Sequence, residues 1–153
     1  MSKIDPENSA QDELWQNFYF VNKHLERSIE RELQATAEIS SADFEILVAL
    51  GNSPTGHLLG KEIARFTGWE KSRISHQLKR MIARGLVLKG VCSTDARSSS
   101  VQISPQGEKS LKIAIKSYNK VVTDMHKGLI NSTEEATLAR VSRKLRKSIE
   151  SAC

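Results

Sequence analysis

The residues best suited to a chemical role lie between Lys71 and Arg84, where basic and small polar side chains recur on one face of a predicted helix. At about 100° per residue, the outward side of that helix carries three cations, one imidazole, one hydroxyl and no acid: Ser72, Arg73, His76, Lys79 and Arg80. An ordinary solvated helix face usually interleaves glutamate with lysine, so that neighbouring charges pair. A face made only of donors instead suits phosphate oxygens and the acceptor atoms of guanine.

Position along the helix suggests different partners for these side chains. Ser72 and Arg73 lie in the first turn, where a helix that enters the major groove places its base-reading residues. His76 is either a further base contact or a surface histidine without a target. Lys79 and Arg80 lie further along and suit phosphate contacts. The opposite side of the helix is apolar and is predicted to be buried: Ile74, Leu78, Met81 and Ile82.

The elements before this stretch complete a helix-turn-helix. A short helix is predicted from Leu58 to Phe66, with Leu59, Ile63 and Phe66 on one face. Gly68 interrupts it, and the second helix runs over residues 70–84 with Gly85 at its C-terminal cap. Two helices joined by a tight glycine-containing turn are typical of a unit whose second helix enters the major groove of DNA.

A β-hairpin is predicted directly after the second helix. Residues 86–92 and 99–104 favour strand, and the polar segment "STDARS" joins them. An arginine on such a loop, here Arg97, suits the negative potential of a minor groove. Asp95 would be repelled by phosphate, so we expect it to accept loop N–H groups and to pair with an arginine. The alternative is an ordinary exposed turn.

Longer helices are predicted on both sides of this unit. Residues 12–37 have an apolar stripe at steps of three and four, and a short apolar helix follows a capping box at Ser40 and Asp43. Ser104-Pro105 starts a long helix, and Ser132 with Glu135 has capping-box spacing before a last helical stripe. A small central unit cannot bury the apolar stripes of both the first and the last helices. These stripes therefore either pack on each other within one chain or form the interface of a dimer, and we favour the dimer.

Charge is distributed unevenly over the 153 residues, although the net charge is only +5. Residues 1–56 have a net charge of −6, whereas residues 57–105 carry 9 basic and 3 acidic side chains. A concentrated positive middle predicts a surface that faces a polyanion. With 39% hydrophobic and 27% charged residues, the composition is that of a folded globular protein.

Several classes of protein are not expected from the sequence. No apolar stretch has a transmembrane length of roughly 18 residues, and the N-terminus lacks the apolar segment of a signal peptide, so a cytoplasmic protein is predicted. The four histidines show no metal-ligand spacing, and there is no nucleophile motif or phosphate-binding glycine loop, so neither a metal site nor an enzyme is predicted.

The chain resembles the MarR family of bacterial transcription regulators. The matching residues are "KSRISHQLKRMIARGLV" (71–87) and "DARSSSVQISPQG" (95–107), with Ser104 where the family commonly has threonine. The resemblance implies a mainly α fold with a small β-hairpin, in which a winged helix-turn-helix lobe at 57–104 lies between dimerisation helices at 11–38 and 106–151 of a single domain, 1–153.

The resemblance also implies a function and its sites. The chain would act as a homodimer that binds a pseudo-palindromic operator in double-stranded DNA, as a ligand-responsive repressor. Recognition-helix contacts would come from Lys71, Ser72, Arg73, Ser75, His76, Lys79 and Arg80, and wing contacts from Asp95, Arg97 and Ser98. Family members often bind small aromatic or anionic effectors beside the dimerisation helices, where Trp15, Phe18 and Phe44 could line a pocket; the same aromatic residues could instead be core. No cofactor is implied.

Two alternatives remain open at this stage. The winged helix could bind a partner protein, with its basic face incidental to that interaction. The chain could also sense redox state through Cys92, at the end of the first wing strand, where nearby cations would lower the thiol pKa. Cys92 is otherwise a small strand residue.

Overall fold

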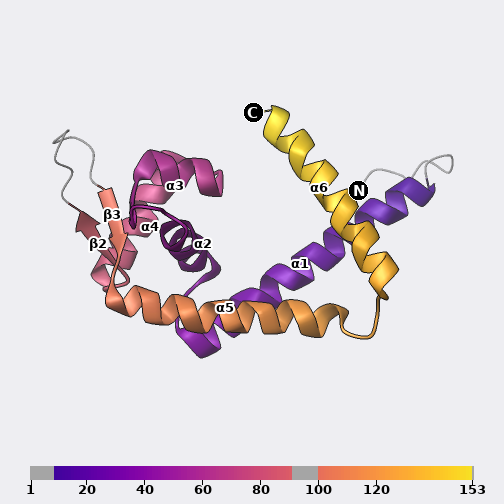
Figure 1. The fold of residues 1–153 in the computed structure, drawn as a ribbon, viewed down its shortest axis with the longest axis horizontal. Helices are drawn as coiled ribbons and strands as arrows, with labels where there is room; N and C mark the ends of the chain where they lie inside the picture. The colour runs from indigo at the N-terminus through magenta and orange to yellow at the C-terminus, as the bar shows by residue number, and fades with distance from the viewer. Residues whose placement is uncertain (1–8, 91–99, 153) are drawn as a thin grey trace. The chain divides into compact units, whose positions relative to one another are not determined.

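The computed structural model describes residues 9–90 and 100–152 (Figure 1). The order of elements is α1, α2, β1, α3, α4, β2, β3, α5 and α6. Contacts between residues divide the chain into two compact units, Met1–Val121 and Val122–Cys153. The mainly α-helical fold with a small antiparallel sheet agrees with the class predicted from the sequence.

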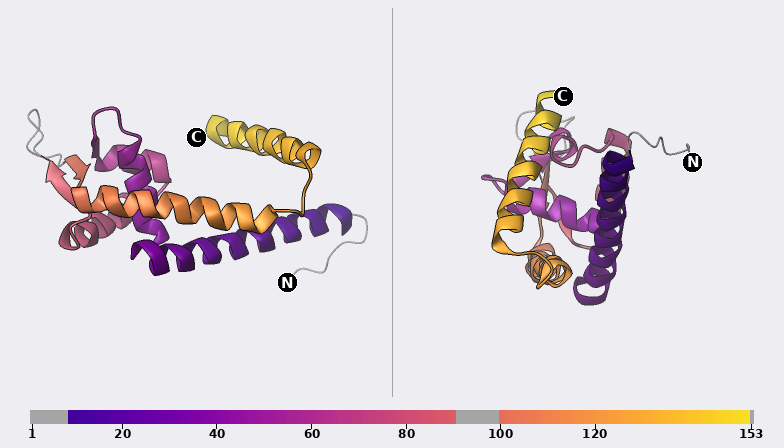
Figure 2. Two further views of the ribbon diagram at one scale, coloured as in Figure 1. Left: turned by 60° about the horizontal axis from the view of Figure 1, so that its bottom comes forward. Right: turned by 90° about the vertical axis from the view of Figure 1, so that its right-hand side faces the viewer.

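Helix α1 spans Ser9–Ala37 and α2 spans Ser41–Gly51. The predicted capping box at the start of α2 is confirmed, because the Asp43 N–H donates to Ser40 Oγ at 3.1 Å and the Ser40 N–H donates to the Asp43 carboxylate at 2.9 Å. The C-terminal part of α1 lies alongside α5 (Pro105–His126) (Figure 2), and Thr36 and Ser117 share a hydrogen bond of 2.7 Å between the two helices.

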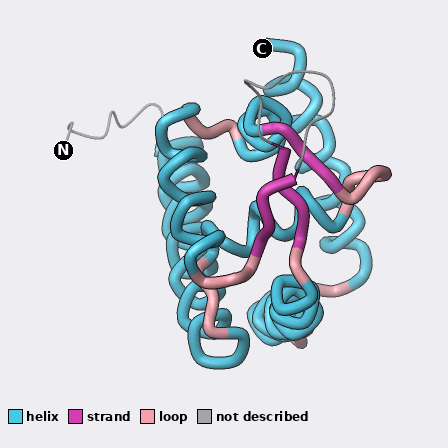
Figure 3. Tube along the Cα trace, turned by 90° about the vertical axis from the view of Figure 1, so that its left-hand side faces the viewer, coloured by secondary structure: helices cyan, strands magenta, loops and turns pink. Residues whose placement is uncertain are grey.

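A three-stranded antiparallel sheet replaces the predicted two-stranded hairpin. Its strands are β1 (His57–Leu59), β2 (Val87–Gly90) and β3 (Ser100–Ile103), and they lie in the order β1-β3-β2 (Figure 3). The prediction that a helix begins at Leu58 is wrong, because Leu58 pairs with Val101 across β1 and β3. The hydrogen bonds of β1 go to a strand some forty residues away, so no local pattern announces them.

The two helices of the predicted helix-turn-helix are present, with shorter bounds. Helix α3 covers Gly60–Thr67 and α4 covers Lys71–Ala83. Ile63 is buried as expected, but Phe66 is exposed and Leu59 belongs to β1, so the predicted shared face of these three residues was wrong.

The elements of the first unit share one apolar core. It includes side chains from α1, α2, α3, α4, the sheet and α5, among them Leu33, Ile46, Leu47, Ile63, Ile74, Met81, Val101 and Ala114. Because the core receives residues from both sides of the helix-turn-helix, it fixes α4 on the rest of the unit.

Helix α5 begins as the Ser104-Pro105 pair predicted. Ser104 Oγ accepts a hydrogen bond from the Gly107 N–H at 2.9 Å and donates to the carbonyl of Gly85 at 2.5 Å. The cap of α5 therefore also holds the turn that follows α4.

The second unit contains α6, Ser132–Ala152. The predicted capping box of Ser132 and Glu135 is wrong by one position. The Asn131 side chain accepts from the N–H groups of Thr133 and Glu134, and the Glu134 carboxylate accepts from the Asn131 N–H. Asparagine caps as well as serine, so the spacing alone did not select between them.

Candidate nucleic-acid interface

The turn between α3 and α4 fixes where the second helix starts. Gly68 ends α3 in the left-handed region, at φ 72°, and its N–H donates to the carbonyl of Ala64 at 2.8 Å. Thr67 Oγ1 donates to the carbonyl of Ile63 and accepts from the Trp69 N–H. The predicted role of Gly68 in the turn is confirmed.

The far end of α4 closes with a glycine cap. Gly85 has φ 72°, its N–H donates to the carbonyl of Ile82 at 3.0 Å, and the Leu86 N–H donates to the carbonyl of Met81 at 3.0 Å. These two bonds form a Schellman motif, in which glycine tolerates the left-handed backbone that a side chain would disfavour. Helix α4 is therefore fixed at both ends.

The inward face of α4 differs from the prediction at one position. Ile74 and Met81 are buried and Leu78 is half-buried, as expected, but Ile82 is 39% exposed. Its place is taken by Gln77, which is buried and donates to Asp43 Oδ1 at 2.7 Å. An amide with a charged partner is stable in a core position that apolar periodicity does not identify.

The outward face of α4 is as predicted. All seven residues assigned to the recognition helix are exposed, and α4 contains no acidic residue: Lys71, Ser72, Arg73, Ser75, His76, Lys79 and Arg80. Unpaired backbone N–H groups at the helix N-terminus add positive potential near the first of these residues. The geometry presents hydrogen-bond donors on a rigid convex surface, which is the arrangement that a major groove accepts.

Arg73 has an intramolecular partner. Its guanidinium lies over the indole of Trp69, 3.7 Å from the ring centroid. Burial raises the pKa of the Glu45 carboxyl, while the positive charge of Arg73 acts in the opposite direction. Arg73 therefore packs on the turn that precedes α4, a contact that the sequence did not predict.

Asp43 joins α2 to α4 from within the core, whereas the sequence predicts only that it caps a helix. It is fully buried and accepts from Ser40, from Gln77 and from Arg84 Nη1 at 2.7 Å. Arg84 Nη2 also donates to the carbonyl of Glu38 at 2.5 Å. The carboxylate therefore links the start of α2 to the middle and the end of α4. No local pattern reveals partners 34 and 41 positions away.

The predicted wing residues Asp95, Arg97 and Ser98, and also Cys92, lie outside the described residues. The strands before and after them are paired, with Gly90 opposite Ser100 and Lys89 opposite Val101.

The three aromatic residues predicted to line an effector pocket lie on two helices, with Trp15 and Phe18 on α1 and Phe44 on α2. Trp15 and Phe18 pack edge to face on α1, with ring centroids 6.0 Å apart, and both are about half exposed. Phe44 packs against Tyr118 at 5.6 Å and lines a groove of about 1170 Å³ together with Trp69 and Arg73, among other residues. Neither Trp15 nor Phe18 lines that groove.

Residues 9–90 and 100–152 contain no group of three or more side chains that could together hold a metal ion. Nor does any helix in those ranges have the length and apolar character needed to cross a membrane.

Comparisons with known proteins agree with this geometry. Residues 38–98 match the family model of the MarR family. No curated protein sequence matches the chain.

Solved structures match over nearly the whole chain. A MarR family transcriptional regulator from Streptomyces coelicolor in complex with DNA is 21% identical, with a TM-score of 0.82 over 97% of this chain and 91% of that one. AbsC, from the same organism, is 22% identical, with a TM-score of 0.82 over 99% of each chain. The organohalide-sensing regulator RdhR in its 2,4-dichlorophenol-bound form is 23% identical, with a TM-score of 0.79 over 97% and 87% of the two chains.

The family match covers the helix-turn-helix and the start of the sheet, and the fold likeness extends over the flanking helices. Residues 38–98 are therefore similar to the MarR family, and the fold of the whole chain is similar to that of solved MarR family regulators.

Proposed function

We propose that this protein is a transcriptional regulator that binds specific sequences in double-stranded DNA as a homodimer. The observation that carries the proposal is the exposed, acid-free donor face of α4, which follows the glycine turn at Gly68 and ends at the glycine cap of Gly85. Arg73 in the first turn would read a base edge, and Lys79 and Arg80 would hold phosphates. The similar S. coelicolor regulator whose structure contains DNA supports this reading.

The homodimer is supported by apolar side chains that single elements leave exposed. Helix α1 exposes Leu14, Phe18 and Val21, and α6 exposes Leu138, Val141, Leu145 and Ile149. Large apolar residues that recur along one helix stripe usually mark an interface. A two-fold dimer would present two copies of α4 to the two halves of a pseudo-palindromic operator.

A ligand-responsive repressor working in the cytoplasm is the finer form of the proposal, and it includes no enzymatic activity. The groove beside Phe44 and Tyr118 would hold a small effector, as the dichlorophenol-bound form of RdhR illustrates for that protein. Because Arg73 also lines this groove, a bound effector would act directly on a base-reading side chain.

Genomic fragments selected by the purified protein would supply the operator, and variants would then test the interface. Arg73→Ala should weaken operator binding about tenfold to a hundredfold, since a good base contact contributes about 1–3 kcal/mol. Lys79→Ala should weaken binding to all duplexes similarly and reduce the salt slope by about one. Lys116→Ala on α5 removes the same charge from an exposed position and should change neither.

The alternative, a winged helix that binds a partner protein, makes the opposite prediction. In that case the chain would bind no duplex at low salt, or would bind with an affinity independent of salt. If Cys92 controls the protein by oxidation, peroxide should change the operator affinity of the native chain. The same treatment should leave the operator affinity of Cys92→Ser unchanged.

A further inference from the structure

Arg73 is the one cation of the donor face on α4 that lies over an aromatic ring. Its Cζ atom is 3.7 Å from the centroid of the Trp69 ring, a distance at which the two planar groups are in contact. Trp69 belongs to the turn that precedes α4, and its N–H donates to Thr67 Oγ1 at 3.3 Å. The stack therefore joins a side chain of the helix to the turn that fixes where the helix begins.

Trp69 is itself held in place by the apolar core. Its indole is half-buried and packs against the core of the first unit. A large ring that is packed on one side has few conformations to adopt. The face of an indole also attracts a cation, because its electron density is negative there. Trp69 is therefore a fixed surface on which the guanidinium of Arg73 rests.

The stack covers the face of the Arg73 guanidinium and leaves its edge available. Five N–H donors lie in the plane of an arginine side chain, and a base edge is read by two of them side by side. In the parts of the chain that the structure describes, no ion pair or side-chain hydrogen bond uses the donors of Arg73. Arg84 differs, because Asp43 and the carbonyl of Glu38 occupy its donors. Arg73 is therefore held without losing the donors that a base requires.

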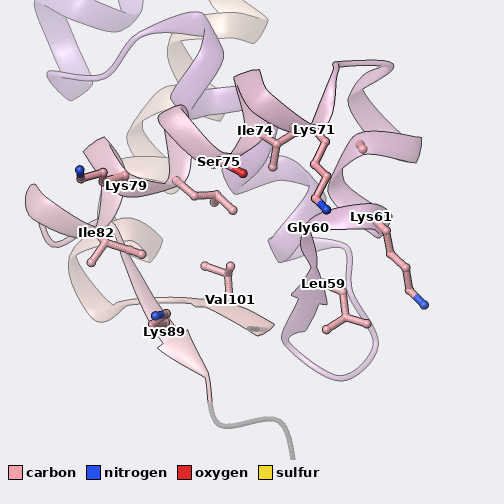
Figure 4. A pocket seen from close by; sticks show the side chains of 12 residues that line it. Leu59, Gly60, Lys61, Lys71, Ile74, Ser75, Lys79, Ile82, Lys89 and Val101 are labelled. Carbon is pink, nitrogen blue, oxygen red and sulfur yellow. The ribbon is translucent and has the colours of Figure 1, made fainter. Parts of the chain in front are cut away.

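The lysines of α4 have no comparable support. Lys71 and Lys79 extend beside a groove of about 970 Å³ between α4, the start of α3 and the sheet (Figure 4), where Ile82 is exposed. None of the described residues that line this groove is aromatic. A flexible ammonium group suits a phosphate, whereas reading a base edge requires a planar group in a fixed orientation. The stack thus distinguishes Arg73 from the lysines around it.

We propose that Trp69 is a positioning residue for base recognition, which holds the N–H edge of the Arg73 guanidinium toward a guanine in the major groove. Guanine presents two acceptors there, O6 and N7, that match the paired donors of an arginine. Ordering a long side chain at an interface costs entropy, and a side chain that is already ordered in the free protein avoids much of this cost. The proposal rests on the proposed function, because it assigns a role within the same DNA-binding face.

Substitutions of Trp69 measure its contribution to operator binding. Trp69→Leu should weaken operator binding about threefold to tenfold, the cost of ordering one long side chain. Trp69→Phe keeps a ring under the guanidinium and should recover most of this loss. Affinity for a duplex without the operator should not change, since phosphate contacts do not depend on the stack. Phe66→Leu is the matched control, an exposed aromatic residue of α3 outside the stack, and it should change neither affinity.

A double-mutant cycle separates positioning from a structural role of Trp69. If Trp69 acts through Arg73, Trp69→Leu should have no further effect on operator affinity once Arg73→Ala is present. If the ring instead sets the position of the whole helix, Lys79 and Arg80 are displaced as well. The loss would then be as large in Arg73→Ala as in the native chain, and the proposal would be wrong. Tighter operator binding by Trp69→Leu would also overturn it, because the stack would then hold Arg73 away from DNA.

The charge of Glu45, on α2, is the other influence on Arg73. Burial raises the pKa of the Glu45 carboxyl, while the charge of Arg73 acts in the opposite direction. Glu45→Gln removes this charge and leaves the ring in place, so it should not weaken operator binding. A loss in Glu45→Gln equal to that in Trp69→Leu would mean that the charge positions Arg73, and the proposal would fail.

The guanine is identified by its own chemistry. Replacing each operator guanine in turn by 7-deazaguanine removes the N7 acceptor. At one guanine of each half-site this replacement should weaken binding of the native chain about threefold to tenfold and have no effect on Arg73→Ala. In Trp69→Leu the effect of the same replacement should be smaller than in the native chain. An operator without such a guanine would refute the assignment of Arg73 and Trp69.

Fluorescence detects the stack in solution without DNA. In Trp15→Phe, Trp69 is the remaining tryptophan of the chain, so its emission is observed alone. Arg73→Ala in that background should shift the emission maximum, whereas Lys79→Ala should not. No shift would mean that the guanidinium does not lie over the ring, and the proposal would fail.

The failure of this proposal is distinct from the failure of the proposed function. A native chain that binds no duplex at low salt would refute the proposed function. A native chain that binds its operator no more tightly than Trp69→Leu does would refute the role of Trp69 alone.

Discussion

Asp43 is a single buried carboxylate on which the position of α4 depends. It accepts hydrogen bonds from the backbone and hydroxyl of Ser40, from Gln77 and from Arg84, and its side chain has no solvent exposure. A charge in such a position is stable only when its partners satisfy it, so removal of the charge leaves buried donors without an acceptor. One residue therefore couples the capping of α2 to the placement of the donor face.

Asp43→Asn should lower the free energy of unfolding by about 2–3 kcal/mol, because hydrogen bonds to a charged group contribute about 1.5–3 kcal/mol. Urea denaturation of the two proteins measures this difference. Glu26→Gln removes a carboxylate that pairs with Lys23 at the surface, and it should change stability by less than about 1 kcal/mol. A loss for Asp43→Asn no larger than for Glu26→Gln would show that the buried network contributes little.

The same carboxylate predicts a pH dependence of stability. Burial by itself would raise the pKa of Asp43, but the hydrogen bonds from Ser40 and the charge of Arg84 outweigh it, and the pKa is lowered. The unfolded chain then binds more protons, so the contribution is complete above the ordinary aspartate pKa of about 3.9 and is lost as the pH falls through the folded-state value.

Unfolding free energies of the native protein and of Asp43→Asn should consequently converge as the pH falls below about 4. Between neutral pH and about 5 their difference should stay constant. A difference that widens in acid would mean that the folded-state pKa is raised rather than lowered.

The outward residues of α4 could be predicted from sequence because helical periodicity alone decides which positions share a face. The inward face was less predictable, because periodicity takes no account of contacts with other elements. Periodicity treats every isoleucine in the stripe as buried and every glutamine as exposed, yet Ile82 is open and Gln77 is buried. What decides these two positions is a carboxylate on another helix and the shape of a groove, neither of which is a local property.

The elements were predictable where their signals are local. The caps at Ser40, Gly85 and Ser104 and the glycine turn at Gly68 all depend on residues within a few positions, and each is where the sequence placed it. Strand β1 was missed because three residues carry no periodicity and its partner strand is distant. The cap of α6 was displaced because adjacent asparagine and serine are both good caps.

Gly107, in the first turn of α5, makes a prediction about how elements pack. A methyl group at this position would overlap the carbonyl oxygen of Leu86 and contact Ile103. That carbonyl accepts from the Ser104 N–H, so it cannot move without disturbing the junction between β2 and α5.

Gly107→Ala should therefore lower the free energy of unfolding by about 1–3 kcal/mol, the usual cost of an overpacked site, although alanine is the better helix former. Chemical denaturation checks this. Gly60→Ala is the matched control, because a methyl group on Gly60 meets nothing within 4 Å. Equal effects of the two substitutions would mean that the backbone at Leu86 can shift to accommodate the methyl group at little cost in stability.

For the whole molecule, the unpartnered stripes of α1 and α6 predict its assembly. Phe18→Glu on α1 and Leu145→Glu on α6 place a charge on each exposed stripe, and burying an unpaired charge in an interface is strongly unfavourable. Each variant should sediment as a monomer at concentrations where the native chain is a dimer. Phe66→Glu, on the exposed side of α3, should leave the mass unchanged. Native protein that sediments as a monomer would contradict the dimer.

The dimer in turn predicts a dependence on operator geometry that no single lobe would show. Two copies of α4 related by a two-fold axis meet the same face of DNA only when the half-sites lie about 34 Å, or one helical turn, apart. Insertion of about five base pairs between the half-sites rotates one of them to the opposite face of the duplex, since a full turn takes about 10 base pairs. Affinity should then fall to that of a single half-site, and insertion of a further five should restore the facing but not the distance. Gel-shift titrations of these three duplexes decide the matter: unchanged affinity across the series would mean that each lobe binds independently and that the stripes on α1 and α6 serve another partner.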